Sequence, residues 1–258
     1  MLSRTDPERW FRHYSPAGDA PRRIVCFPHA GGSAPFYRPL AKRLCPGTEV
    51  LAVQYPGRLD RYGESMVDDL HVLADVIHAA LGALDEKPTV LFGHSMGAMV
   101  AFEVARRMEA DGTARPSALF ASSRRAPATS RPETFDLSDD GLIAHLRRLG
   151  GTSPVLLEDK AALEPILRVM RNDYRAVQNY RYAPGPKLGC PIVALIGADD
   201  SRVTVPEARM WQSETDADFT LKAFPGGHFY LADRYTEVAD EITGVLRNSA
   251  ETTPARSV

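Results

Sequence analysis

One segment restricts the possible folds of this chain more than any other. The apolar run Thr89–Phe92 passes directly into Gly93-His94-Ser95-Met96-Gly97, and a helical pattern then continues to Ala110. The pattern Gly-x-Ser-x-Gly is common by chance, but a strand before it and a helix after it are typical of a nucleophile elbow. Glycine at positions 93 and 97 fits a turn so tight that side chains would collide with neighbouring backbone. We therefore predict a sheet with Ser95 exposed at the end of one strand.

Strand and helix patterns alternate along the rest of the chain. Short continuous apolar runs predict strands, and apolar residues spaced three or four apart predict helices. Strands that are apolar on both faces and separated by helices are typical of a mainly parallel sheet covered by helices on both faces. A length of 258 residues suits one such unit, so we predict a single α/β domain over residues 1–258. The predicted strands lie near residues 24–28, 50–53, 89–92, 117–121, 191–196 and 219–224, and the predicted helices near 35–45, 67–84, 97–110 and 231–247.

Residues 124–187 interrupt this alternation. They contain no strand pattern and two helical patterns, 137–149 and 158–182, joined by Gly150-Gly151-Thr152-Ser153-Pro154. Connections between strands and helices usually have about two to six residues, so a segment this long is an insertion. We predict an inserted helical lid, with a helical excursion of no function as the alternative. The short polar tail 249–258 is expected to be disordered.

The charge balance and the cysteines argue against several classes of protein. The chain has 31 basic and 33 acidic side chains and a formal net charge of −2, whereas nucleic-acid-binding domains are usually basic. No stretch approaches the ~20 apolar residues of a membrane helix, and the N-terminus lacks the apolar core of a secretory signal. Cys26, Cys45 and Cys190 lie far apart without metal-binding spacing. We expect a cytoplasmic protein with free thiols and no nucleic-acid or membrane partner.

Ser95 needs a base, and that base needs an acid that orients it. In chains with a nucleophile elbow the acid and then the histidine follow the serine in sequence. His228 lies in a Gly-rich turn after the last predicted strand, where the base is expected. Asp199 and Asp200 follow the strand 191–196, and adjacent side chains in an extended turn point in different directions. Only one of them can reach His228; we favour Asp200 and keep Asp199 as the alternative.

A reaction at Ser95 through a tetrahedral intermediate also needs two N–H donors for the oxyanion. One is the amide of Met96, directly after the serine, and the other is expected from the loop after the first core strand. That loop is Pro28-His29-Ala30-Gly31-Gly32, which makes the Ala30 amide the candidate. The sequence contains no metal-ligand spacing, Walker loop or Gly-x-Gly-x-x-Gly motif. We therefore expect hydrolysis without a metal or another cofactor.

Six segments together resemble the type II thioesterases, which are discrete α/β-hydrolases that accompany polyketide synthases and nonribosomal peptide synthetases. The resemblance extends from Trp10 to about Arg247. The pairing of an HAGG loop with YPGR and GHSMG separates the chain from general esterases and lipases. In the acid loop, Ala198 and Ser201 stand where the family often has Asp and Pro. The segments are Trp10-Phe11, Cys26-Phe27-Pro28-His29-Ala30-Gly31-Gly32-Ser33, Gln54-Tyr55-Pro56-Gly57-Arg58, Gly93-His94-Ser95-Met96-Gly97-Ala98, Leu149-Gly150-Gly151-Thr152 and Pro225-Gly226-Gly227-His228-Phe229.

The resemblance implies a fold, a triad and a reaction. The family's triad falls on Ser95, Asp200 and His228 of this chain. The implied reaction is hydrolysis of acyl groups from the phosphopantetheine arm of acyl- or peptidyl-carrier proteins, which removes stalled or misloaded units. A monomer is expected. Two alternatives stay open: a chain-terminating medium-chain acyl-carrier-protein thioesterase with a deeper pocket, and a non-catalytic binding protein of the same fold.

Overall fold

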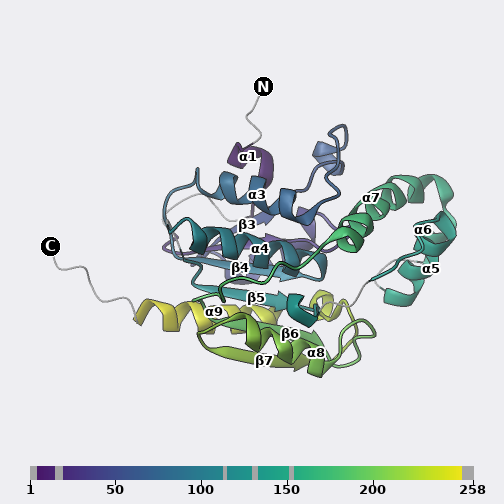
Figure 1. Cartoon of the computed structure of the whole chain (residues 1–258). Coiled ribbons are helices and arrows are strands. Elements are labelled where there is room, and N and C mark those ends of the chain that lie inside the picture. The colour runs from purple at the N-terminus through teal and green to yellow at the C-terminus, as the bar shows by residue number, and fades with distance from the viewer. Residues whose placement is uncertain (1–4, 15–19, 113–114, 130–132, 151–153, 252–258) are drawn as a thin grey trace.

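A seven-stranded sheet forms the centre of the molecule (Figure 1). The computed structural model describes residues 5–14, 20–112, 115–129, 133–150 and 154–251. The strand order is β1-β3-β2-β4-β5-β6-β7, with β1 antiparallel to β3 and every other neighbouring pair parallel. The predicted α/β-hydrolase architecture is therefore confirmed. The strands are β1 (Phe11–His13), β2 (Arg23–Phe27), β3 (Glu49–Val53), β4 (Thr89–His94), β5 (Ala118–Ser122), β6 (Ile192–Gly197) and β7 (Phe219–Phe224).

The two faces of the sheet bury two separate hydrophobic cores. Successive side chains of a strand point to opposite faces, so Val25 and Leu91 pack against α3 and α4, while Ile24 and Val90 pack against α2 and α9. This is why residues 24–27, 90–92 and 118–121 of the central strands are apolar on both faces. The covering helices are α2 (Arg38–Leu44), α3 (Leu70–Leu81), α4 (Met96–Ala110) and α9 (Tyr235–Glu251), and two short helices, α1 (Pro7–Trp10) and α8 (Val205–Arg209), lie at the periphery.

The insertion forms three helices where the sequence predicted two. These are α5 (Asp139–Leu149), α6 (Pro154–Glu158) and α7 (Lys160–Asn179). Figure 1 shows α5, α6 and the N-terminal part of α7 grouped together beyond one end of the sheet. They share a small core of their own, which includes Leu142 and Leu167, whereas Val177 near the end of α7 belongs to the main core. Residues 151–153 of the predicted Gly-rich connection lie outside the described residues.

The structure differs from the sequence prediction at one strand and at the end of the last helix. β1 was not predicted, because three residues with one charged member show no strand periodicity. Helix α9 continues to Glu251, so the predicted tail at 249–258 begins too early, and residues 252–258 lie outside the described residues. Within the described ranges, no helix is both long and apolar enough to cross a membrane.

Candidate active site

The turn between β4 and α4 holds Ser95 in a strained conformation. Its φ of 56° and ψ of −117° are rare for a residue with a side chain. A Cβ added at Gly93 would lie 2.3 Å from the carbonyl oxygen of Gly97, and one added at Gly97 would lie 2.0 Å from that of Phe27. Both glycines are therefore required by the close backbone approach, as the sequence predicted. The Ser95 amide donates to the Ser122 carbonyl at 2.8 Å, which fixes the turn to β5.

Ser95, His228 and Asp200 form a continuous hydrogen-bonded chain. His228 Nδ1 lies 3.0 Å from both carboxylate oxygens of Asp200, and His228 Nε2 lies 3.0 Å from Ser95 Oγ. A carboxylate only accepts, so the Nδ1–H donates to Asp200 and Nε2 is left to accept from the Ser95 hydroxyl. Asp199 is exposed, and its amide donates to the Gly226 carbonyl at 2.9 Å. The structure thus pairs His228 with the favoured one of the two predicted acids.

The surrounding backbone keeps the Asp200–His228 pair in place. Ser123 Oγ donates to the His228 carbonyl at 3.1 Å, and the Arg202 amide donates to Asp200 Oδ1 at 2.8 Å. Burial raises the pKa of Asp200, but the hydrogen bonds from His228 and from the Arg202 amide outweigh burial and leave the pKa below its ordinary value. The carboxylate is therefore ionised at neutral pH and able to stabilise a protonated His228.

Two further histidines pack behind the catalytic candidate. The His94 ring centroid lies 5.5 Å from that of His228, and His94 Nδ1 lies 2.9 Å from Ser122 Oγ. Burial, together with repulsion from His228, lowers the pKa of His29 to about 3 and that of His94 well below its ordinary value. Both rings are neutral at physiological pH, so they add no charge that would compete for Asp200.

The two predicted oxyanion donors border the same cavity as Ser95 and His228. Met96 is the first residue of α4, and Ala30 lies in the loop after β2. In the described part of the chain, neither amide N–H is bonded to a protein acceptor. The positive end of the α4 dipole also faces this position. The arrangement supplies two amides for negative charge that develops beside Ser95.

A buried ion pair that sequence reasoning missed ties the Ala30 loop to the lid helix α7. Arg58 donates to both carboxylate oxygens of Asp173, at 2.7 and 2.8 Å, and to the Gly32 carbonyl at 3.0 Å. Asp173 also accepts from the Gly31 amide at 2.8 Å, and Gly31 has a φ of +79° that favours glycine. Two features of the sequence could have pointed to this pair. Arg58 ends the matched YPGR motif, and Asp173 is a charged residue on the inward face of a helical pattern.

The insertion completes the cavity above Ser95. His145 and Leu149 of α5 and Tyr174 of α7 face the same space as Ser95 and His228. The volume open to the centre of a water-sized sphere is only about 20 Å³, enough for about one water molecule. Among the described residues, no group of three or more His, Cys, Asp or Glu side chains is arranged to hold a metal ion.

Comparison with known proteins agrees with this geometry. Residues 22–246 match the family model described as "Thioesterase domain". The chain is 48% identical over 239 residues to a probable cadicidin biosynthesis thioesterase of Streptomyces griseus and 40% identical over 243 residues to thioesterase PikA5 of Streptomyces venezuelae. These matches cover 92% and 93% of this chain but 66% and 86% of the relatives, so the chain spans slightly less than two thirds of the first relative.

A solved structure gives the same result. The type II thioesterase BorB from the borrelidin biosynthetic cluster superposes with a TM-score of 0.85 at 47% sequence identity, over 92% of this chain and 97% of that one. The family model covers most of the chain, and the mostly parallel sheet with its helices is the fold expected for such a match. The chain therefore belongs to the thioesterase family, and type II thioesterases are among its relatives.

Proposed function

We propose that this chain is a serine thioesterase that removes acyl groups from the phosphopantetheine arm of acyl- or peptidyl-carrier proteins. Its role would be to clear stalled or misloaded units during polyketide or nonribosomal peptide biosynthesis. The observation that carries the proposal is the Ser95–His228–Asp200 chain of hydrogen bonds at the floor of a lid-covered cavity. The family match and the biosynthetic clusters named for its relatives support this choice of substrate.

In the proposed acylation step, Ser95 Oγ attacks the thioester carbonyl carbon. His228 Nε2 accepts the hydroxyl proton, and Asp200 stabilises the resulting imidazolium. The Ala30 and Met96 amides donate to the oxyanion of the tetrahedral intermediate. Collapse of the intermediate breaks the carbon–sulfur bond, and His228 returns the proton to the phosphopantetheine thiol as it leaves.

Deacylation repeats the same transfers with water. His228 Nε2 takes a proton from water, whose oxygen attacks the acyl-serine carbonyl. The second tetrahedral intermediate uses the same two amides. His228 then protonates Ser95 Oγ, which releases the carboxylic acid and restores the free enzyme. In both steps the protons pass only among Ser95, His228, water and the leaving thiol, so the proposed reaction uses no cofactor.

The size of the cavity favours editing over release of finished medium-length chains. The space above Ser95 that is open to the centre of a water-sized sphere is only about 20 Å³, and its walls include the charged side chains Arg124, Glu133 and Arg202. A chain-terminating enzyme for medium-length acyl groups needs a deep apolar pocket, because each buried methylene contributes about 0.8 kcal/mol. The short, polar cavity favours small acyl units as the substrates.

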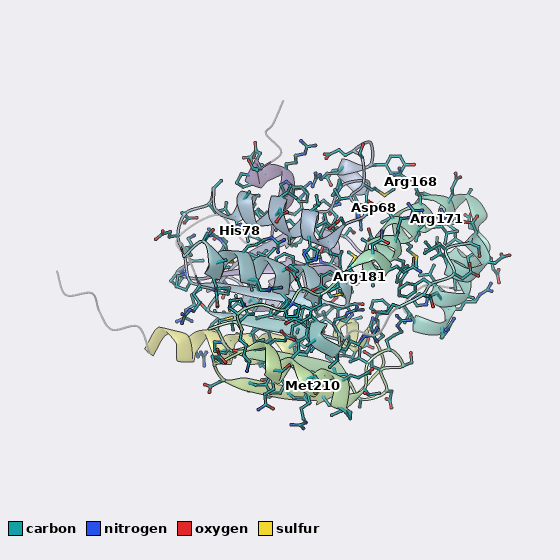
Figure 2. The ribbon with its side chains drawn as sticks, viewed as in Figure 1. Asp68, His78, Arg168, Arg171, Arg181 and Met210 are labelled. Atoms are coloured by element: carbon teal, nitrogen blue, oxygen red, sulfur yellow. The ribbon has the colours of Figure 1, made fainter. Side chains whose placement is uncertain are left out.

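The lid also offers a surface for an acidic carrier protein. Helices α5 and α7 carry five arginines; of these, Arg168 donates to the Gly57 carbonyl, Arg171 pairs with Asp139, and Arg175 lies 4.0 Å from Asp68. Arg168 and Arg171 mark this part of α7 in Figure 2.

The other two candidates are freer to meet a partner. Arg147 and Arg148 are exposed in the last turn of α5 and make no ion pair within the described ranges. We therefore propose these two side chains as the electrostatic contact with the carrier protein. The free thiols of Cys26, Cys45 and Cys190 fit a cytoplasmic location beside such a partner, and we propose that the chain acts as a monomer.

The proposal is tested by turnover of a carrier protein loaded with a short acyl group, with release of the free thiol as the measurement. Ser95→Ala is expected to lower the rate at least about a thousandfold, because the nucleophile is removed. Its melting temperature should match that of the wild type, which shows that the fold is intact. A folded variant that keeps more than about a tenth of the wild-type rate contradicts the assignment of Ser95.

A further inference from the structure

A cluster of charged side chains forms one wall of the catalytic cavity. Glu133 lies between three guanidinium groups: it pairs with Arg124, with Arg125 at 2.6 Å and with Arg202 at 2.8 Å. The side chains of Glu133 and Arg125 are 10% and 5% exposed. All four residues border the same space as Ser95. An acyl group bound to Ser95 therefore extends toward an ion-pair cluster.

Several contacts hold this wall rigidly. The indole N–H of Trp211 donates to the Arg124 carbonyl at 2.7 Å, and the Arg202 guanidinium lies 5.0 Å from the centre of the Phe135 ring. Burial raises the pKa of Glu133, but the attraction of Arg124 and Arg125 outweighs it, so the pKa is below its ordinary value. The carboxylate stays ionised and keeps the cluster together at neutral pH.

A second space lies against the same wall. This groove has a volume of about 500 Å³, and its lining is mixed: it includes Met99 and the ring of Tyr182 together with the polar side chain of Gln178. Three residues, Arg124, Glu133 and Val177, border both the groove and the catalytic cavity. Arg181, which Figure 2 labels beyond the C-terminal end of α7, also borders the groove. The Arg124–Glu133 pair thus lies between a small cavity and a larger groove.

The cost of desolvation makes this partition selective. An alkyl chain that reaches the Glu133 cluster removes water from charged groups and offers them no new partner. Short acyl groups end before the cluster and avoid that cost. In the groove beyond the wall, the same methylenes would gain by burial.

We propose that the Arg124–Glu133 pair is an acyl-length gate. It restricts Ser95 to short acyl groups, and its removal would join the cavity to the groove, where the distal carbons of a medium-length acyl chain would lie. The inference rests on the proposed thioesterase function and names the residues that set its acyl length.

The test is a series of acyl-pantetheine thioesters from acetyl to decanoyl, with kcat/KM measured for each. For the wild type, kcat/KM is expected to fall steeply beyond about four carbons. The double variant Arg124→Ala/Glu133→Ala leaves the net charge of the wall unchanged and removes the two charged side chains that border both spaces. Each methylene buried in an apolar site is worth about fourfold in binding. The ratio of octanoyl to propionyl kcat/KM should therefore rise at least about tenfold.

Two further variants isolate the role of the gate. Glu133→Gln keeps the size of the side chain and should change the ratio less than the double variant. Arg23→Ala/Glu49→Ala removes a buried ion pair, 2.9 Å long, at the opposite ends of the strands, and should leave the length profile unchanged. Circular dichroism and melting temperature report whether each variant folds.

The possible outcomes are distinct. A wild type that hydrolyses octanoyl and propionyl thioesters equally well contradicts the gate, even if the double variant does not fold. A folded double variant with an unchanged profile contradicts it as well. Absence of hydrolysis at every length would contradict the proposed function together with the gate.

Discussion

The floor and the cover of the cavity are built in different ways. Ser95, Asp200 and His228 follow the strands β4, β6 and β7 of one sheet, and in the Ser95 turn a Cβ at Gly93 or Gly97 would collide with backbone. The cover consists of α5, α6 and α7, which share a small core of their own, although the end of α7 packs into the main core through Val177. The floor therefore leaves little freedom to the reacting atoms. The cover can be repacked at the cost of a few apolar contacts, which fits the proposal that acyl and partner selectivity lie in the insertion.

One buried pair connects these two regions. Asp173 comes from the cover, and Arg58 and Gly31 come from loops of the floor. Replacing one partner of a buried ion pair usually costs about 3–5 kcal/mol, because the other charge is left without a partner. The connection should therefore persist when the rest of the cover moves, which makes the two regions less independent than their cores suggest.

The largest expected effect separates the two acids of the floor. Asp200→Asn should lower kcat by up to ~10⁴, as the equivalent change does in serine proteases, because the amide favours the wrong tautomer of His228. Asp199→Asn should lower kcat less than about threefold, since Asp199 is exposed and does not pair with His228. Steady-state kinetics on an acyl-pantetheine substrate measure both. The reverse order would assign the acid to Asp199.

A smaller effect is expected where the two regions meet. Asp173→Asn weakens the hydrogen bond from the Gly31 amide to residue 173, and Gly31 is next to the proposed oxyanion donor Ala30. Loss of one oxyanion donor costs about 10²–10³ in kcat, so a displaced donor should cost about ten- to a hundredfold with KM nearly unchanged. Affinity for an acyl trifluoromethyl ketone, which forms an oxyanion with Ser95, should fall by a similar factor.

Stability alone cannot produce that pattern. Glu49→Gln weakens another buried ion pair, with Arg23, and should lower the melting temperature without changing kcat. If Asp173→Asn also lowers only the melting temperature, the pair is structural, and the cover and the floor are not coupled through the oxyanion loop.

The sequence predicted the floor better than the cover, for a physical reason. Gly93, Ser95 and Gly97 obey a local rule, because strand, turn and helix follow one another along the chain. His228 and Asp200 follow the ends of predicted strands, and neighbouring parallel strands bring such ends together. Contacts of the cover join residues far apart in sequence, such as Arg58 and Asp173, at |i−j| of 115. Hydrophobic periodicity carries no information on which residues pair across such a distance in sequence, so neither the Arg58–Asp173 pair nor the Glu133 cluster was predicted.

An effect of a few fold is expected at the outer surface of the cover. Arg147→Glu/Arg148→Glu should lower kcat/KM for an acyl-carrier protein about three- to tenfold at low salt, with less loss at high salt, because exposed charges are screened. Hydrolysis of a small acyl thioester should stay the same. Lys42→Glu/Arg43→Glu is the matched control: these cations are also adjacent, exposed and in the last turn of a helix, α2. Equal losses on both substrates would indicate a misfolded cover.

The smallest effect on turnover, and a distinct effect on stability, is expected from His145. This side chain is buried in the cover, with ring centroids 4.9 Å from Tyr174 and 5.6 Å from Phe135. Burial, together with repulsion from Arg202, lowers its pKa to about 4. Between that value and about pH 6.5, the unfolded chain binds a proton at His145 that the folded chain does not bind. The free energy of unfolding must therefore decrease as pH falls from about 6.5 to 4.

His145→Phe removes this titration and keeps an aromatic ring in the cover. The slope of unfolding free energy against pH should decrease by up to about 1.4 kcal/mol per pH unit, so the variant regains up to about 2 kcal/mol relative to the wild type at pH 5. Denaturant unfolding at pH 5 and pH 7 measures the slope. An unchanged slope in His145→Phe would mean that the cover opens below pH 6.5 before the floor unfolds, since an open cover lets His145 take up its proton in the native state.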